Sequence, residues 1–185
     1  MQQPPWGTQP HHYSCGMRVL FVCTGNICRS PTAERLAVAF AREGEFELTA
    51  SSAGTQGLTG HAMDPTAALV LSQLGGDPEG FVARRLTPAI TADAELVLTM
   101  TASHRDAVLA LSPRHMRRTF TLLEASSLAA ASGARSVAAL ADARAVHSVE
   151  TLDIGDPYRR DPSVYEEAGE LIAASLPNVL RLAQP

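Results

Sequence analysis

The chain has 185 residues, of which 45% are hydrophobic, and this length and composition suit one domain with a full core. Lys and Arg total 15 against 19 Asp and Glu, a net charge of −4 without a long basic run, which argues against nucleic-acid binding. No apolar stretch has the length of a membrane span, so we expect no membrane partner.

The cysteine content points to a reducing compartment. Three cysteines are few and odd in number for a disulfide framework, and no spacing of Cys and His is typical of a zinc site. We therefore expect a cytoplasmic protein with reduced thiols, no cofactor and no bound metal. In solution we expect a monomer or a weak dimer.

Residues 1–16 are rich in Gln, Pro and Gly and lack apolar periodicity, which predicts a flexible N-terminal tail. Within it, His11 and His12 are expected to be solvated rather than metal-bound, and Cys15 to be an exposed thiol without a role. The folded domain is then predicted to span residues 17–185.

The next stretch, residues 19–31, reads VLFVCTGNICRSP and organises the rest of the chain. Its first residues, Val19 to Val22, form a short apolar run that predicts a buried parallel strand. Gly25 and Asn26 follow in a tight turn, because these two residue types adopt positive φ most easily.

A helix is predicted over residues 32–43, with Ser30 as its N-cap, Pro31 at its first position and Gly44 at its end. The intervening loop then lies at the carboxyl end of a strand, with its backbone N–H groups pointing inward. Together with the positive helix N-terminus, these amides form a cradle for a tetrahedral oxyanion.

Two side chains of this loop carry the expected chemistry. Cys23 begins the loop, and the positive potential of the helix N-terminus and of Arg29 favours its thiolate form, which is a nucleophile. The planar guanidinium of Arg29 is able to bind two phosphate oxygens at once. The pattern therefore predicts nucleophilic chemistry on a phosphate group.

The segment CTGNICRSP, Cys23 to Pro31, resembles the signature loop of the low-molecular-weight protein tyrosine phosphatases. The resemblance implies an α/β fold with a single domain, a central parallel sheet of about four strands, helices on both faces and a phosphate-binding loop after the first strand. It also implies a protective disulfide between Cys23 and Cys28 when the nucleophile is oxidised. The substrate-binding loop residues that it implies are Thr24, Gly25, Asn26, Ile27, Cys28 and Ser30.

A second strand is predicted over residues 46–52, and the Ser-Ala-Gly segment that follows also resembles the family. There, the resemblance implies that Ser52 supports the loop through a hydrogen bond to Asn26. Phe81 stands where a histidine that braces the loop is common in the family. Arg84 is either a surface residue or a buried ion-pair partner.

The rest of the chain alternates strands and helices. Helices are expected after Asp64-Pro65, over residues 103–111, over residues 123–146 with a break near Gly133, and after Asp161-Pro162, with Pro177 ending or kinking the last one. Strands are expected over residues 96–100 and 117–122. This alternation predicts a parallel sheet, whose ligands bind beyond the carboxyl ends of the strands.

The segment DIGDPYRRD, residues 153–161, resembles the family's Asp-Pro-Tyr loop, which carries the general acid. Asp156 is the acid candidate because it directly precedes the proline, whereas Asp153 and Asp161 do not. Tyr158 is expected to form an aromatic wall of the cleft. Arg159 and Arg160 stand where many relatives carry a second aromatic residue, and we predict that they favour acidic substrates.

The sequence thus predicts a protein tyrosine phosphatase that acts on phosphotyrosine-containing proteins, through two-step, metal-independent hydrolysis and a phosphocysteine on Cys23. Arg29 binds the phosphate and Asp156 serves as general acid and base. One alternative is a protein-arginine phosphatase of the same family, whose members tend to carry threonine at the position of Ile27. Another is a non-catalytic phosphopeptide-binding module. A thioredoxin-coupled arsenate reductase needs further cysteines, and none follows Cys28.

Overall fold

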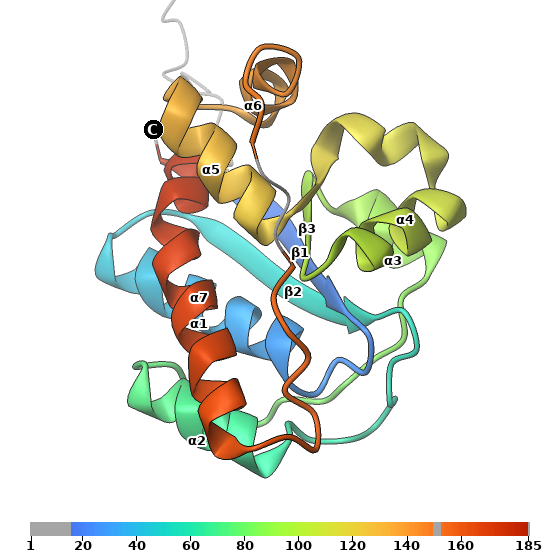
Figure 1. The fold of residues 1–185 in the computed structure, drawn as a ribbon, viewed down its shortest axis with the longest axis vertical. Coiled ribbons are helices and arrows are strands. Elements are labelled where there is room, and N and C mark those ends of the chain that lie inside the picture. The colour runs from blue at the N-terminus through green and yellow to red at the C-terminus, as the bar shows by residue number, and fades with distance from the viewer. Residues whose placement is uncertain (1–15, 150–152, 185) are drawn as a thin grey trace, which may run out of the picture.

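The computed structural model describes residues 16–149 and 153–184, which form a four-stranded parallel sheet with strand order β2-β1-β3-β4. The strands are β1 (Met17–Cys23), β2 (Leu48–Gly54), β3 (Leu96–Thr99) and β4 (Thr119–Thr121). The α/β class and the parallel sheet with helices on both faces are confirmed (Figure 1).

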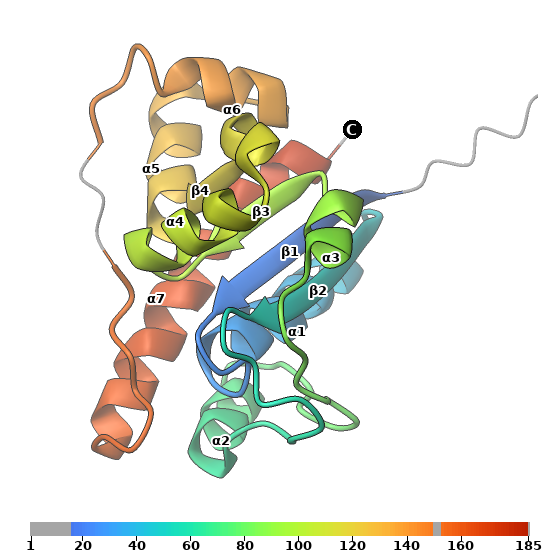
Figure 2. The same ribbon diagram turned by 90° about the vertical axis from the view of Figure 1, so that its right-hand side faces the viewer.

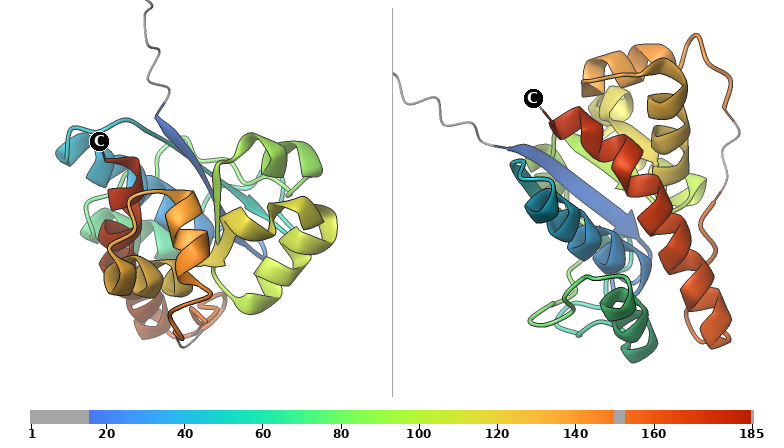
Figure 3. Two further views of the ribbon diagram at one scale, coloured as in Figure 1. Left: turned by 90° about the horizontal axis from the view of Figure 1, so that it is seen from above. Right: turned by 90° about the vertical axis from the view of Figure 1, so that its left-hand side faces the viewer.

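Helices cover both faces of the sheet. One face is covered by α1 (Arg29–Glu43), α5 (Leu122–Ser132) and α7 (Pro162–Leu180), and α7 packs against both other helices (Figures 1 and 3). Figure 2 shows the opposite face, with α3 (Pro88–Asp93) and α4 (Ala102–Leu111). The remaining helices are α2 (Pro65–Gln73), α6 (Val137–Ala143) and the two 3₁₀ segments Pro113–Arg118 and Arg181–Ala183.

The central strand β1 divides the core, because successive side chains of a strand point to opposite faces. Val19 and Phe21 are buried in the larger hydrophobic cluster with α1, α5 and α7. Leu20 and Val22 are buried in a smaller cluster that includes Val108 of α4. Burial on both faces explains why β1 is a continuous apolar run, and it fixes the strand end from which the loop at Cys23 departs.

Several predicted helix boundaries are confirmed. Asp64 caps α2 by accepting hydrogen bonds from two amides, and Asp161 caps α7 by accepting from the amide and the hydroxyl of Ser163. Gly133 ends α5 in the left-handed conformation, with φ 65°.

Other predictions are wrong. Ser30 is not the N-cap of α1, because the helix begins at Arg29 with Cys28 as the flanking residue, so the Ser30 hydroxyl is available to the loop. Of the two effects predicted for Pro177, ending α7 or kinking it, the first is wrong, because the helix continues to Leu180. The short helix α3 and the 3₁₀ segment before β4 were not predicted.

The predicted tail, residues 1–16 with His11, His12 and Cys15, lies outside the described residues except for Gly16. In the described part of the chain, no helix combines the length and the hydropathy that a membrane crossing needs. Nor do His, Cys, Asp and Glu side chains of those residues gather in threes where they might hold a metal ion.

Candidate active site

The loop between β1 and α1 has its carbonyl groups turned outward. Four of them accept a hydrogen bond from an amide of the segment 55–64, at 2.9–3.0 Å; the pairs are Cys23 with Thr55, Thr24 with Gln56, Gly25 with Leu58, and Ile27 with Asp64. The described chain has no cis peptide bond, and in a trans peptide the N–H points opposite to the C=O before it. The amides of Thr24, Gly25, Asn26 and Cys28 therefore point inward, as an anion cradle requires.

Cys23 lies within this loop and is only 2% exposed. Its Sγ lies 2.9 Å from the Ser30 hydroxyl and accepts a hydrogen bond from the Asn26 amide at 3.3 Å. Two hydrogen-bonding groups of the loop thus contact the sulfur.

Asn26 adopts a left-handed backbone conformation, with φ 58°, and its side chain is completely buried. Its Nδ2 donates to Ser30 Oγ at 3.0 Å and to Ser52 Oγ at 2.8 Å, and its Oδ1 accepts from the Arg84 amide at 2.8 Å. Both donor hydrogens and the acceptor oxygen of the side-chain amide thus help to hold a strained loop residue in place.

Ser52 connects Asn26 to helix α1 through hydrogen bonds. Its hydroxyl donates to Glu34 Oε2 at 2.6 Å, and burial raises the pKa of Glu34, partly offset by this hydrogen bond. Glu34 was not identified from the sequence, since nothing in the local pattern distinguishes it from a surface residue of the helix.

Arg29 lies at the base of the site and is 4% exposed. Its Nη1 donates to the Ile154 carbonyl at 2.9 Å, and its Nη2 pairs with Asp156 Oδ2 at 3.0 Å. Its Nε is buried without a hydrogen-bond partner among the described residues. The guanidinium therefore joins the two loops that carry the predicted chemistry.

The loop and the Asp-Pro-Tyr segment enclose a cavity of about 200 Å³. Its lining residues are Thr24, Gly25, Ile27, Cys28, Arg29, Gln56, Leu58, Asp156 and Tyr158. Gln56 and Leu58 were not predicted, because they belong to the loop after β2. Their amides donate hydrogen bonds to the carbonyls of residues 24 and 25, and these bonds hold them at the site.

Cys28 is 5% exposed and is a free cysteine, as is Cys23. Burial, first, and then the negative charges of Asp64, Cys23 and Asp156 raise the pKa of the Cys28 thiol far above its usual range, against a smaller effect of Arg29. Cys28 is therefore a neutral thiol at physiological pH.

Two positions that the sequence left open have structural roles. Phe81 is buried, and the Arg35 guanidinium lies 5.7 Å from its ring centroid. Arg84 is exposed and is not a buried ion-pair partner, but its Nε donates to the Ser52 carbonyl at 2.8 Å.

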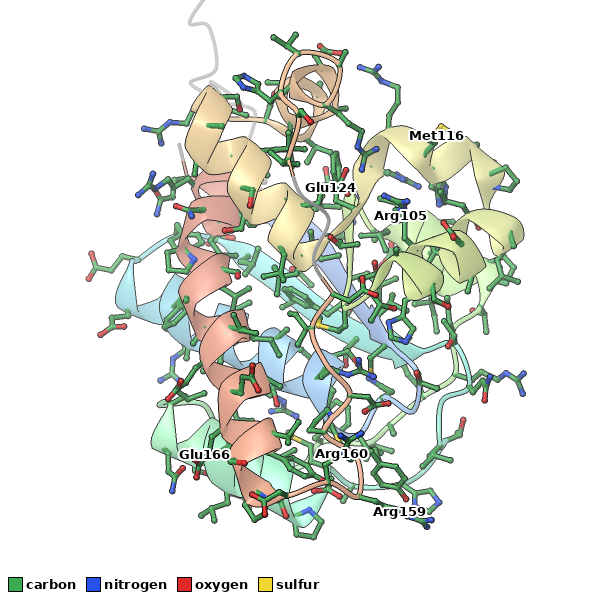
Figure 4. All side chains as sticks on the ribbon, viewed as in Figure 1. Arg105, Met116, Glu124, Arg159, Arg160 and Glu166 are labelled. Atoms are coloured by element: carbon green, nitrogen blue, oxygen red, sulfur yellow. The ribbon has the colours of Figure 1, made fainter. Side chains whose placement is uncertain are left out.

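Arg159 and Arg160 project from the segment between the Asp-Pro-Tyr turn and α7 (Figure 4). Arg159 has φ 60°, its amide donates to Tyr165 Oη at 3.2 Å, and its guanidinium lies 5.1 Å from the ring centroid of Tyr158. Neither arginine pairs with a carboxylate in the described part of the chain.

Comparisons with known proteins find relatives of this chain in one family of phosphatases. The family model described as low molecular weight phosphotyrosine protein phosphatase matches residues 18–135. The low molecular weight protein-tyrosine-phosphatase Etp of Escherichia coli strain K12 is 32% identical over 167 residues, which cover 90% of this chain and 95% of Etp.

Solved structures with this fold include two phosphatases of different stated specificity. A low molecular weight protein tyrosine phosphatase from T. tengcongensis is 29% identical, with a TM-score of 0.72 and coverage of 89% of this chain and 97% of that one. A mutant YwlE arginine phosphatase with a phosphorylated active-site serine is 25% identical, also with a TM-score of 0.72, and covers 88% of this chain and 93% of its own.

Proposed function

Because the chain belongs to the low molecular weight phosphotyrosine protein phosphatase family, we propose that it hydrolyses phosphotyrosine in proteins through a phosphocysteine on Cys23. The observation that carries the proposal is the approach of Arg29 to Asp156, at 3.0 Å, in a cavity formed by the loop that begins at Cys23. A nucleophile, a phosphate-binding cation and a proton donor are the groups that such a reaction needs.

In the first step, the Cys23 sulfur attacks phosphorus and the bond from phosphorus to the tyrosine oxygen breaks. Asp156 donates its proton to the departing oxygen, so that a neutral phenol leaves. The inward amides and Arg29 bind the equatorial phosphate oxygens while charge redistributes among them.

In the second step, Asp156 removes a proton from water, whose oxygen attacks phosphorus and releases inorganic phosphate. The sulfur–phosphorus bond breaks and the Cys23 thiolate is restored. Ser30, whose hydroxyl lies 2.9 Å from the sulfur, stabilises the thiolate as it leaves.

Substrate selection follows from the walls of the cavity. Tyr158, 40% exposed, offers an aromatic face on which a phosphotyrosine ring stacks. Arg159 and Arg160 lack carboxylate partners within residues 16–149 and 153–184, in a chain of net charge −4. They favour phosphopeptides with acidic residues next to the phosphotyrosine.

A second candidate function is the hydrolysis of phosphoarginine, which is favoured by the likeness to the YwlE arginine phosphatase structure. Ile27, which lines the cavity, argues for phosphotyrosine, because the resemblance associates arginine phosphatases with threonine at this position. A non-catalytic phosphopeptide-binding module is less consistent with the presence of Cys23, Arg29 and Asp156 together.

The test is phosphate release from a phosphotyrosine peptide and from a phosphoarginine peptide, side by side, for the unaltered protein and for Cys23→Ser, without added metal. Release from phosphotyrosine alone, abolished in Cys23→Ser, supports the proposal. A preference for phosphoarginine replaces it with the second candidate. Tight binding of both peptides without turnover favours the binding module.

The proposed reaction requires Cys23 in its reduced state, which fits a cytoplasmic location. Cys28 lies five positions later in the same loop, and a disulfide between the two would make peroxide inactivation reversible.

A further inference from the structure

The first turn of α4 lies between the two segments that carry the proposed chemistry. We call this turn, residues 101–104, the α4 turn. Only Met100 separates this turn from the end of β3. The Met100 amide donates to the Val22 carbonyl at 3.0 Å, and the Met100 carbonyl accepts from the Ile154 amide at 2.9 Å. The α4 turn is therefore adjacent both to the end of β1 and to the segment that leads to Asp156.

Toward the phosphate-binding loop, the contact is made by His104. Its Nε2 lies 2.8 Å from the Thr24 hydroxyl, and its Nδ1 lies 2.9 Å from the hydroxyl of Thr101, which is the N-cap of α4. Thr24 directly follows Cys23, and its amide is the first of those that point into the cavity. The imidazole thus fixes the residue next to the nucleophile.

His104 is suited to this contact because it is neutral. It is 6% exposed; burial, and to a smaller degree the charge of Arg29, lower its pKa to about 4, against opposite effects of Asp156 and Asp153. A neutral imidazole has one donor and one acceptor nitrogen, and here each nitrogen faces one hydroxyl group. The ring orientation is fixed by these two hydrogen bonds.

Toward the acid-bearing segment, the contact is made by Asp153. Its Oδ1 accepts the Ala102 amide at 2.8 Å, one of the amides that a helix leaves unpaired at its N-terminus. The positive end of the helix stabilises this carboxylate further. The next residue, Ile154, is fully buried and its carbonyl accepts from Arg29, so the chain is held just before Asp156.

We propose that the α4 turn positions both segments, with His104 holding Thr24 beside the nucleophile and Asp153 holding the segment that places Asp156. This inference rests on the proposed phosphatase function. The two contacts affect different parts of the reaction. His104 acts on the phosphate site, which every substrate uses, whereas Asp153 acts on proton donation, which matters most for a poor leaving group.

The experiment compares the turnover of phenyl phosphate, which has a poor leaving group, with that of p-nitrophenyl phosphate, which has a good one. Asp153→Ala is expected to lower kcat/KM for phenyl phosphate about tenfold, a part of the total effect of an acid catalyst, and to change kcat/KM for p-nitrophenyl phosphate little. Asp153→Asn keeps an acceptor oxygen for the Ala102 amide and is expected to restore most of the loss.

His104→Ala is expected to lower kcat/KM about tenfold for both substrates equally and to weaken inhibition by inorganic phosphate, since small displacements of reacting groups are costly. His104→Gln keeps a polar atom near Thr24 and should recover part of the activity. Asp106→Asn, on the exposed side of the same helix, is the matched control and should resemble the unaltered protein.

Equal losses for both substrates in Asp153→Ala would overturn the role of Asp153 in proton donation. Unchanged kinetics and phosphate inhibition in His104→Ala would overturn that of His104. If His104→Ala does not fold, then His104→Gln tests the role of His104, and Asp153→Ala and Asp153→Asn test the role of Asp153. If the unaltered protein hydrolyses neither ester, or Cys23→Ser retains activity, then the proposed function fails, which is distinguishable from failure of the α4 turn.

Discussion

Arg29, the first residue of α1, and Asp156, in the Asp-Pro-Tyr segment near the other end of the sequence, form an ion pair with 3.0 Å between Nη2 and Oδ2. The Arg29 side chain is 4% exposed and that of Asp156 is 54% exposed, so the pair joins the buried base of the cavity to its open side. An arriving phosphate competes with Asp156 for the guanidinium. In the proposed reaction, substrate binding therefore frees the carboxyl group to protonate the leaving oxygen.

We expect Asp156→Asn to lower kcat/KM for a phosphotyrosine peptide by about 10²- to 10⁴-fold, because the amide cannot donate a proton as the acid does. The loss should be smaller for p-nitrophenyl phosphate, whose leaving group needs little protonation. Steady-state kinetics with the two substrates check this. An equal loss for both would mean that Asp156 acts only as the partner of Arg29.

The left-handed conformation of Asn26 is open to a test with two variants. Asn26→Gly and Asn26→Ala both lose the hydrogen bonds to Ser30, Ser52 and the Arg84 amide, but only glycine adopts φ 58° without strain. We expect both to lower kcat/KM, and Asn26→Ala to unfold more easily than Asn26→Gly, by about 1 kcal/mol.

Urea unfolding of the two variants measures this difference. If alanine proves as stable as glycine, the backbone at this position relaxes on substitution, and the conformation is not held under strain by its surroundings.

Sequence reasoning predicted the parts of the site that are encoded locally. The apolar run of β1, the turn at Gly25-Asn26 and the Asp-Pro-Tyr segment each carry their signal within a few residues. It did not predict that His104 contacts Thr24, because 80 positions separate them and a histidine in a helical pattern has no distinguishing neighbour. Asp153 was set aside as a rival acid, and its contact with α4 depends on the way that the loop is folded back.

Ser30 illustrates the same limit at short range. Its type suited an N-cap, but the α1 helix begins one residue earlier, and the hydroxyl instead lies 2.9 Å from the Cys23 sulfur and accepts from Asn26. Local propensity correctly predicted that the Ser30 hydroxyl forms hydrogen bonds, but it assigned the wrong partner. The folded loop, and not the neighbouring sequence, decides which groups lie within reach of the hydroxyl.

The proposed role of Arg159 and Arg160 is tested with the double variant Arg159→Asn, Arg160→Gln, in which asparagine tolerates the left-handed conformation of residue 159. We expect KM for an acidic phosphopeptide to rise several-fold and KM for a neutral one to stay constant. The difference should shrink as salt increases. Arg42→Gln, at the exposed end of α1, is the control. An unchanged KM for the acidic peptide contradicts the proposal.

The Cys28 thiol is expected to respond to oxidation in a pH-dependent manner. After peroxide converts Cys23 to a sulfenic acid, a disulfide forms only when the Cys28 thiolate attacks the Cys23 sulfur and displaces hydroxide. Burial raises the pKa of Cys28, so the thiolate is scarce at neutral pH and increases as pH rises. Recovery of activity by added thiol should therefore be more complete at pH 9 than at pH 7, and should be poorer in Cys28→Ser. Equal recovery in that variant rules out a protective disulfide.

The buried, neutral state of His104 also makes the stability of the fold depend on pH. Its pKa is about 4 in the folded chain, against 6.5 for an ordinary histidine, so between these values the unfolded chain binds a proton that the folded chain does not. Protonation then favours unfolding, and the contribution of His104 is complete above about pH 6.5 and is lost as pH falls toward 4. The slope approaches roughly 1.4 kcal/mol per pH unit within that window.

Chemical denaturation at a series of pH values checks this prediction. The free energy of unfolding of the unaltered protein, minus that of His104→Gln, should decrease as pH falls from 7 to 4.5, because glutamine does not titrate. A difference that is constant with pH would contradict the prediction, because it would mean that His104 binds its proton equally well in the folded and the unfolded chain. The folded chain would then hold a charged imidazole near Arg29.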